Sequence, residues 1–272
     1  MRIALVGATG LVGSALVRAA QAAGHDVIAL SKESGVDVLQ PEGLADLLGG
    51  TEAVVDVTQS PSLDEDEATR FFARAAENLG RAGTAAGVHR SVVLSIIGVD
   101  QIAAAGTDAG TGSDGYFRAK YAHEEATRAH APGARVVRSA QFHDIARQAI
   151  GWGRDGDRST VPDLVIQPVA VDAMVEVLLG AATGEVGGPL TEVAGPRREQ
   201  LAMLSTAYAE RTGDSVTVVA GPVGDLVRDG VLLPHDGAAL VGPAFTQWLS
   251  TSVQTGATGG CLRDLTLPLR GA

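Results

Sequence analysis

The chain has 272 residues, of which 45% are hydrophobic and 19% charged, so we expect an ordinary globular protein with one α/β core and a small appended lobe. Its formal net charge of −11 disfavours nucleic acid and anionic membranes as partners, because both would be repelled. The single cysteine, Cys261, excludes an intramolecular disulfide and a cysteine zinc site. No signal peptide or membrane-length apolar stretch is recognisable, so we predict a cytoplasmic protein, a monomer or a homodimer, that binds a small molecule and no metal.

Short apolar runs and helical patterns alternate over the first 150 residues. The apolar runs predict buried strands at 2–6, 26–30, 53–57, 91–95 and 134–138. Apolar residues at helical spacing predict helices at 11–23, 42–48, 65–86, 116–130 and 140–150. This alternation is typical of parallel strands buried on both faces, so we predict a Rossmann fold, which is a doubly wound parallel sheet.

The pattern weakens after residue 150. We expect short strands at 164–167 and 190–193, and helices at 170–180, 197–211 and 241–250. Glycine and polar residues at 106–115 predict a loop. We therefore divide the chain into an NAD(P)-binding Rossmann domain, 1–150, and a smaller α/β substrate lobe, 151–272, with the segments at about 164–195 available to add strands to the first domain.

A glycine-rich loop joins the first predicted strand to the first predicted helix. Its three glycines would allow a tight turn, close approach of a pyrophosphate to the backbone, and close packing of the helix on the sheet. The free N–H groups of the helix start would then face the anion. We predict that a nicotinamide dinucleotide lies over this loop, which consists of Gly7, Ala8, Thr9, Gly10, Leu11, Val12 and Gly13.

The end of the second strand bears on the choice of cofactor. A carboxylate there would accept from the ribose 2′-hydroxyl of NAD, but the strand runs into Ser31 and Lys32, and Lys32 would suit the 2′-phosphate of NADP. We expect NADP(H), with NAD(H) as the alternative if Lys32 is only a surface lysine and Glu33 binds the ribose. Thr58, just after the third strand, is also placed at the cofactor.

Tyr116 and Lys120 lie four residues apart in a predicted helix, and so share one of its faces. A phenol is a poor acid or base at neutral pH, and a neighbouring ammonium would lower its pKa. Lys120 would also reach a ribose hydroxyl. We predict that Tyr116 is a general acid/base, the alternative being an ordinary surface pair. Ser95, just past the fourth strand, would position a substrate carbonyl or else only cap local backbone.

These residues resemble the short-chain dehydrogenase/reductase superfamily, and within it the atypical NmrA-like branch of NAD(P)-binding and epimerase-like members. The segments at 138–143 and 167–172 are also similar. The resemblance implies that Tyr116 protonates a carbonyl oxygen as hydride arrives from the nicotinamide. Lys120 would lower the pKa of the tyrosine and hold the ribose, Ser95 would position the carbonyl, and Phe142 would lie near the nicotinamide.

Three functions are compatible with this resemblance. The first is an NAD(P)H-dependent oxidoreductase that reduces a carbonyl, or oxidises an alcohol, of a small and largely neutral substrate. The second is a non-catalytic NADP(H)-sensing regulator of the NmrA-like kind. The third is a nucleotide-sugar epimerase or dehydratase. Of the remaining polar clusters, His123, Glu124 and Glu125 are interpreted as a solvated helix face, and the acidic run at 64–67 as a helix N-terminal cap.

Overall fold

The computed structural model describes residues 1–106 and 113–254, which form two compact units. The first unit contains Met1–Ile96, Arg118–Arg138 and Val171–Thr191. The second contains Ile97–Phe117, Ser139–Ala170 and the chain from Glu192 onward. These units are defined by the compactness of the chain and not by which ligand each part binds. The two consecutive domains expected from the sequence, a cofactor domain at 1–150 and a substrate lobe at 151–272, therefore stay a prediction.

The main sheet has seven strands, in the order β12-β9-β5-β4-β3-β1-β2. The pairs β1·β2, β1·β3, β3·β4 and β9·β12 are all parallel, which confirms the predicted doubly wound α/β fold. The strand bounds are Arg2–Val6 (β1), Asp26–Leu30 (β2), Ala53–Asp56 (β3), Arg90–Ile96 (β4), Ala134–Ser139 (β5), Leu190–Ala194 (β9) and Ala239–Leu240 (β12).

The strand order reverses at β1. The chain passes from β1 outward to β2 and then returns to the other side of β1 to form β3. In open α/β sheets, ligands bind at such a switch point, beyond the carboxyl ends of the strands. The glycine loop follows β1 directly, so the sheet topology places it at this reversal, beside the end of β3.

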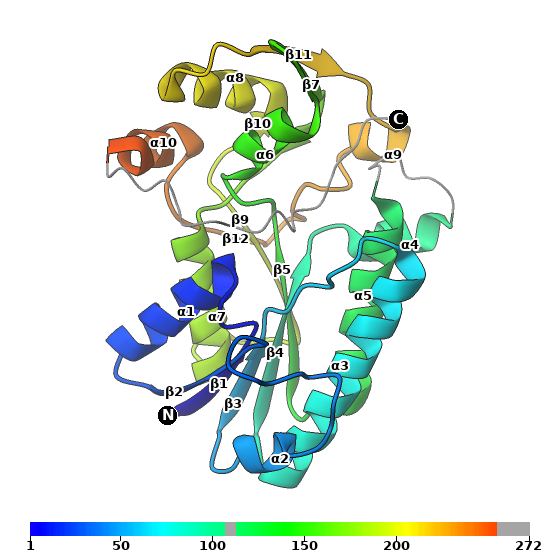
Figure 1. Cartoon of the computed structure of the whole chain (residues 1–272), viewed down its shortest axis with the longest axis vertical. Coiled ribbons are helices and arrows are strands. Elements are labelled where there is room, and N and C mark those ends of the chain that lie inside the picture. The colour runs from blue at the N-terminus through cyan, green and yellow to red at the C-terminus, as the bar shows by residue number, and fades with distance from the viewer. Residues whose placement is uncertain (107–112, 255–272) are drawn as a thin grey trace. The chain divides into compact units, whose positions relative to one another are not determined.

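Helices cover both faces of the sheet in the first unit. Helices α1 (Leu11–Ala22) and α7 (Val171–Thr183) lie on one face, and α3 (Glu65–Ala86) lies on the other with α5 (Asp114–His130) (Figure 1). The short helix α2 (Leu44–Leu47) packs against α3. The core of the unit is aliphatic, with Phe72 as its largest fully buried side chain.

The second unit contains short strands and helices that the sequence indicated only in part. Its sheets pair β7 with β11 and β6, and β8 with β10. A helix, α4, ends just before the loop predicted at 106–115; of that loop, residues 107–112 lie outside the described residues, and Asp114 already begins α5. The strands are Arg154–Asp155 (β6), Arg158–Pro162 (β7), Val165–Ile166 (β8), Glu199–Gln200 (β10) and Thr217–Gly221 (β11), and the helices are Val99–Ala105 (α4), Ile145–Trp152 (α6), Leu201–Thr212 (α8), Asp225–Arg228 (α9) and Phe245–Gln254 (α10).

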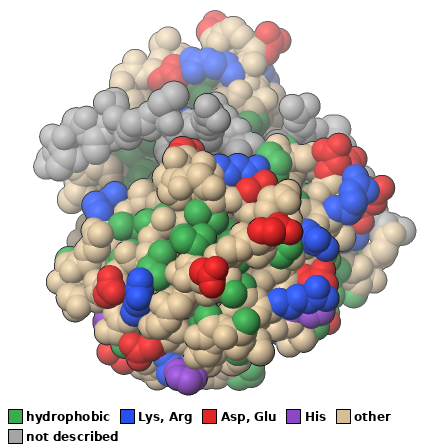
Figure 2. Space-filling model, turned by 60° about the horizontal axis from the view of Figure 1, so that its bottom comes forward, with side chains coloured by type: hydrophobic (Ala, Val, Ile, Leu, Met, Phe, Trp, Pro, Cys, Tyr) green, Lys and Arg blue, Asp and Glu red, His purple; other side chains and the backbone are tan. Residues whose placement is uncertain are grey.

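Acidic and basic side chains are mixed on the face of the molecule that Figure 2 displays. Hydrophobic side chains lie between them. The acidic excess is therefore not gathered into a single patch on that face. Within residues 1–106 and 113–254, no helix combines the length and the apolar character that a membrane span requires.

The predicted cap of α3 is confirmed, and it supplies a test of local stability. The carboxylate of Asp64 accepts a hydrogen bond of 3.0 Å from the backbone N–H of Glu67. We expect Asp64→Ala to lower the free energy of unfolding by about 1 kcal/mol, measured by urea denaturation, because it leaves a helix N–H without an acceptor. Asp64→Asn is the matched control and should retain most of that stability, since asparagine caps equally well. Equal losses in both variants would mean that charge, not the hydrogen bond, stabilises the helix end.

Candidate functional site

The glycine loop has the backbone geometry that its sequence predicted. Gly7 has a φ of +84°, in the left-handed region that favours glycine, and a Cβ there would meet the backbone of Val57 at 3.0 Å. A Cβ on Gly13 would lie 2.0 Å from the carbonyl oxygen of Gly7, so the helix packs directly on the turn. Gly10 is different, because a Cβ there would make only an ordinary contact of 3.4 Å, with the same oxygen.

The loop ends at the N-terminus of α1. Gly10 is the N-cap residue, and no side chain of the described residues caps the helix. The first turn contains no acidic residue that would compete with an anion. Uncapped N–H groups at a helix start form a ready site for a phosphate. Thr58 lies beside this turn, since a Cβ on Gly7 would meet its backbone nitrogen at 3.1 Å.

The residues after β2 form a tight turn against the glycine loop. Ser31 and Ser34 close it by mutual hydrogen bonds, one of which is donated by Ser34 Oγ to the carbonyl oxygen of Ser31 at 2.8 Å. Glu33 points back to the loop, and its carboxylate accepts a hydrogen bond of 2.7 Å from Thr9 Oγ1. Lys32 and Glu33 are therefore neighbours at the end of the strand, with the carboxylate fixed beside the loop.

Ser95 lies inside β4, one residue before its carboxyl end and not just past the strand, and is almost completely buried. Its hydroxyl has no hydrogen-bond partner among the described residues. A buried hydroxyl without a partner is costly, so such a group marks a position where a ligand would supply the missing bond.

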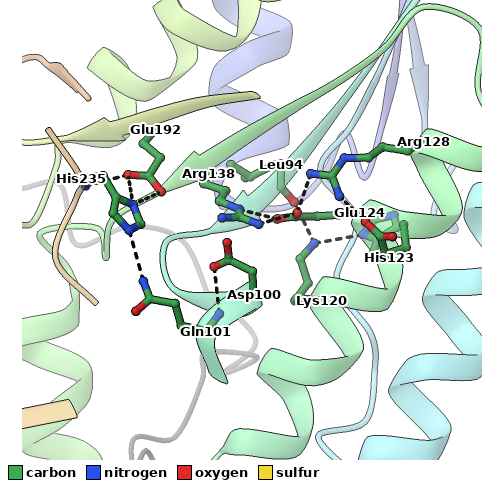
Figure 3. Close-up of polar contacts among 11 residues, drawn as sticks. Leu94, Asp100, Gln101, Lys120, His123, Glu124, Arg128, Arg138, Glu192 and His235 are labelled. Carbon is green, nitrogen blue, oxygen red and sulfur yellow. Dashed lines mark hydrogen bonds and ion pairs between the residues drawn. The ribbon is translucent and has the colours of Figure 1, made fainter. Parts of the chain in front are cut away.

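Lys120 is also buried, and its ammonium is held by neighbouring elements of the first unit. The Nζ atom donates a hydrogen bond of 2.8 Å to the carbonyl oxygen of Leu94, the residue before Ser95. It lies 3.1 Å from Nδ1 of His123 (Figure 3). The centre of the Phe72 ring is 4.6 Å from the same nitrogen. The structure thus brings Lys120 to the same strand end as Ser95.

Lys120 is linked to Asp56 through His123, and neither of these two buried polar side chains was selected as a site residue from the sequence. His123 is fully buried, and its Nε2 lies 3.1 Å from a carboxylate oxygen of Asp56 at the end of β3. The other carboxylate oxygen of Asp56 accepts from both the backbone N–H and the hydroxyl of Thr58. An aspartate that ends an otherwise continuous apolar strand is a signal that could have identified this pair from the sequence.

The interpretation of residues 123–125 as a solvated helix face is wrong for its first two members. Glu124 is fully buried, and both of its carboxylate oxygens accept from the guanidinium of Arg138, at 2.8 and 2.9 Å. Arg128 adds a third hydrogen bond of 2.9 Å (Figure 3). Only Glu125 is on the surface. The arginines make burial of the carboxylate possible, because they balance its charge and occupy its acceptor sites.

Tyr116 lies in α5, four residues before Lys120, and its side chain is buried. Burial raises the pKa of its phenol above the ordinary value, because water no longer solvates the phenolate. This direction is opposite to the lowering that the sequence analysis attributed to Lys120. The assignment of Tyr116 as an acid/base stays a prediction, with the phenol in its protonated form.

Phe142 and His143 belong to the second unit. Phe142 is half-buried and forms a single parallel bridge with Val169. His143 is buried, donates through Nε2 to the carbonyl oxygen of Pro243 at 3.1 Å, and contacts Trp248. Burial lowers the pKa of His143. A pocket in the same unit is lined in part by Asp163 and Gln200, and contains none of the predicted site residues.

The sheet order and the glycine loop at its switch point define a Rossmann-like α/β protein. A family model described as the RmlD substrate binding domain matches residues 1–150, more than half of the chain. The chain belongs to this family, which lies within the short-chain dehydrogenase/reductase superfamily. The resemblance expected from the sequence is thereby confirmed for the superfamily, while the NmrA-like branch stays a prediction.

Individual relatives agree with the family. A dTDP-4-dehydrorhamnose reductase from Mycolicibacterium smegmatis is 32% identical over 204 residues, 68% of this chain and 61% of that protein. The chain thus matches less than two thirds of that relative's length. The solved dTDP-4-dehydrorhamnose reductase from Bacillus anthracis, in complex with NADP, has a TM-score of 0.71 at 15% identity, covering 93% of this chain and 99% of that one. MoeE5, in complex with UDP-glucose and NAD, has a TM-score of 0.68 at 18% identity, covering 93% and 98%.

The buried carboxylate of Glu124 should be sensitive to neutralisation. We expect Glu124→Gln to lower the free energy of unfolding by roughly 3–5 kcal/mol, because it removes the buried negative charge that accepts both hydrogen bonds from the guanidinium of Arg138. The measurement is urea denaturation followed by circular dichroism. Glu125→Gln removes the same charge from the exposed neighbouring position and should cost less than about 1 kcal/mol. Comparable losses would contradict the assignment of Glu124 as the buried partner.

Proposed function

We propose that this protein is an NAD(P)H-dependent reductase that acts on a keto group of a nucleotide-linked sugar. The family and the reductase relative support this substrate class over the small neutral carbonyl compound expected from the sequence. The observation that carries the proposal is the glycine loop at the switch point, where an uncapped helix start follows a turn that only glycine allows. A dinucleotide pyrophosphate fits both features.

The described residues also fit the reacting end of such a cofactor. The buried Ser95 hydroxyl without a partner is the kind of group that positions a carbonyl oxygen. Lys120 would bind a ribose hydroxyl, and Tyr116, protonated in its buried position, would donate its proton to the carbonyl oxygen. A bound nicotinamide would supply the hydride. Phe142 is retained as a proposed neighbour of the nicotinamide.

The preference between NADP(H) and NAD(H) depends on two neighbouring side chains. Lys32 supports NADP(H), because its charge suits a 2′-phosphate. Glu33 supports NAD(H), because its carboxylate is held at the loop by Thr9 and would repel that phosphate. We retain the proposal of NADP(H), and note that the position of Glu33 makes the alternative stronger than the sequence suggested.

The loop offers a variant that separates cofactor binding from folding. Gly10→Ala places a methyl group where the fold tolerates it, since the backbone of Gly10 (φ −71°) suits alanine. It should weaken NADPH binding by about tenfold or more, or about 1.4 kcal/mol, because the methyl group holds the pyrophosphate away from the backbone. Calorimetric titration with NADPH, and separately with NADH, measures the effect and the preference together.

Two further glycine variants control this experiment. Gly151→Ala adds a methyl group in open space within α6 and should leave NADPH binding unchanged, while raising the free energy of unfolding by at most about 1 kcal/mol. Gly13→Ala should destabilise the whole fold, because its methyl group would overlap the carbonyl oxygen of Gly7. Unchanged NADPH affinity in a folded Gly10→Ala protein would show that the cofactor does not lie over this loop.

Tyr116→Phe tests the chemistry and not the binding. With NADPH and dTDP-4-dehydrorhamnose as the assay substrate, we expect turnover to fall by roughly 10²–10⁴-fold while NADPH affinity is retained, because only the proton donor is lost. Loss of NADPH absorbance measures the rate. Full activity in the variant would refute the role of Tyr116.

The same assay separates the alternative functions. A wild-type protein that binds NADPH but turns over neither this substrate nor other carbonyl compounds would favour the NmrA-like regulator. Tightly retained NAD in the purified protein, with no net consumption of cofactor, would favour an epimerase or dehydratase.

A further inference from the structure

The ammonium of Lys120 has one N–H more than its protein partners use. Among the described residues it donates to the carbonyl oxygen of Leu94 and contacts Nδ1 of His123, while the face of Phe72 lies against it. An ammonium has three N–H donors, so two are directed by the protein and the third is available to a ligand. The direction of that third donor is fixed only if the other two are held firmly.

Asp56 determines which nitrogen of His123 faces Lys120 as an acceptor. Thr58 donates twice to one carboxylate oxygen of Asp56, which leaves the other oxygen for Nε2 of His123 at 3.1 Å. A carboxylate only accepts, so Nε2 must carry the proton. In a neutral imidazole, Nδ1 then has the lone pair, and Lys120 can donate to it. The ring of His123 is also held by stacking on Phe72 at 4.6 Å.

We propose that Asp56 and His123 are positioning residues for Lys120, which fix its ammonium against β4 with a single N–H left for the ligand. This inference rests on the proposed function for the role of Lys120, but not for the geometry itself. It assigns a role to the buried side chains of Asp56 and His123, which the proposed proton and hydride transfers do not require.

The charges around Lys120 support this assignment. Burial lowers the pKa of Lys120 to about 8, while the carboxylates of Asp56 and Glu124 act in the opposite direction. Glu124 is already paired with two arginines, whereas Asp56 has no hydrogen bond from an arginine among those described. Burial and the charge of Lys120 lower the pKa of His123, which keeps its ring neutral. Asp56 is therefore the carboxylate best placed to keep the ammonium protonated.

The sequence provides a direct way to observe this group, because Lys32 and Lys120 are the only lysines of the chain. Protein labelled with ¹³C at lysine Cε should give two side-chain resonances, and Lys32→Arg assigns them. We expect the Lys120 resonance to titrate near pH 8. In Asp56→Asn its midpoint should fall by about one pH unit, because the negative charge of Asp56 favours the ammonium form of Lys120. Glu125→Gln, an exposed charge loss on the same helix, should leave the midpoint unchanged.

Two histidine variants separate the two hydrogen bonds. In His123→Asn the amide oxygen reaches the position of Nδ1 and preserves an acceptor for Lys120. In His123→Gln the amide nitrogen reaches the position of Nε2 and preserves the contact with Asp56, but the acceptor for Lys120 is lost. We expect the midpoint of Lys120 to fall in His123→Gln and to stay closer to wild type in His123→Asn. Thermal unfolding confirms that each variant is folded.

The outcomes distinguish this inference from the proposed function. Equal shifts in Asp56→Asn and Glu125→Gln would overturn the positioning role. Equal midpoints in the two histidine variants would overturn it as well, and this comparison remains if Asp56→Asn does not fold. None of these titrations needs cofactor or substrate, so an inactive wild-type protein would defeat only the proposed reaction. In an active protein, turnover should fall as the pH is raised and Lys120 loses its proton. In Asp56→Asn this fall should begin at a lower pH than in wild type.

Discussion

A single buried ammonium connects most of the elements that form the candidate site. Lys120 of α5 bonds to the backbone of β4, lies against an aromatic ring of α3, and reaches the end of β3 through His123. Burial of a charge is costly unless it is compensated, so these contacts exist together or not at all. Arginine could supply the charge but not the compact shape, which explains why a chain with only two lysines places one here.

The glycine loop imposes a second constraint, which is steric and independent of charge. Gly13 brings α1 onto the turn at Gly7, and Gly7 in turn touches the backbone beyond β3. The same backbone segment carries Asp56 and Thr58. The loop that would bind the pyrophosphate and the network that holds Lys120 therefore share the end of β3, so a displacement of this strand end would disturb both.

The sequence predicted the repetitive part of the fold well because periodicity is a local property. The helix at 65–86 was placed to the residue, and every strand of the first 150 residues was found. The pair β7·β11 was missed because β7 begins with Arg158, Ser159 and Thr160 and so shows no continuous apolar run, and its partner lies about sixty residues further along the chain. His123 and Glu124 were misassigned for a different reason. Polar residues on a helix are normally exposed, and only the distant Arg138 and Asp56 make their burial possible.

The protonation states of the buried groups also bear on the direction of the proposed reaction. Burial raises the pKa of Tyr116 and lowers that of Lys120, so in each case it favours the neutral form. A neutral phenol holds the proton that reduction of a ketone consumes, whereas oxidation of an alcohol would require the phenolate as a base. In the proposed reaction Lys120 would have to stay charged to stabilise the phenolate of Tyr116, and the carboxylate of Asp56 opposes loss of that charge. A buried phenol is protonated at rest but is also a weaker acid than a solvated one, so proton donation in the proposed reduction would depend on the charge that Lys120 retains.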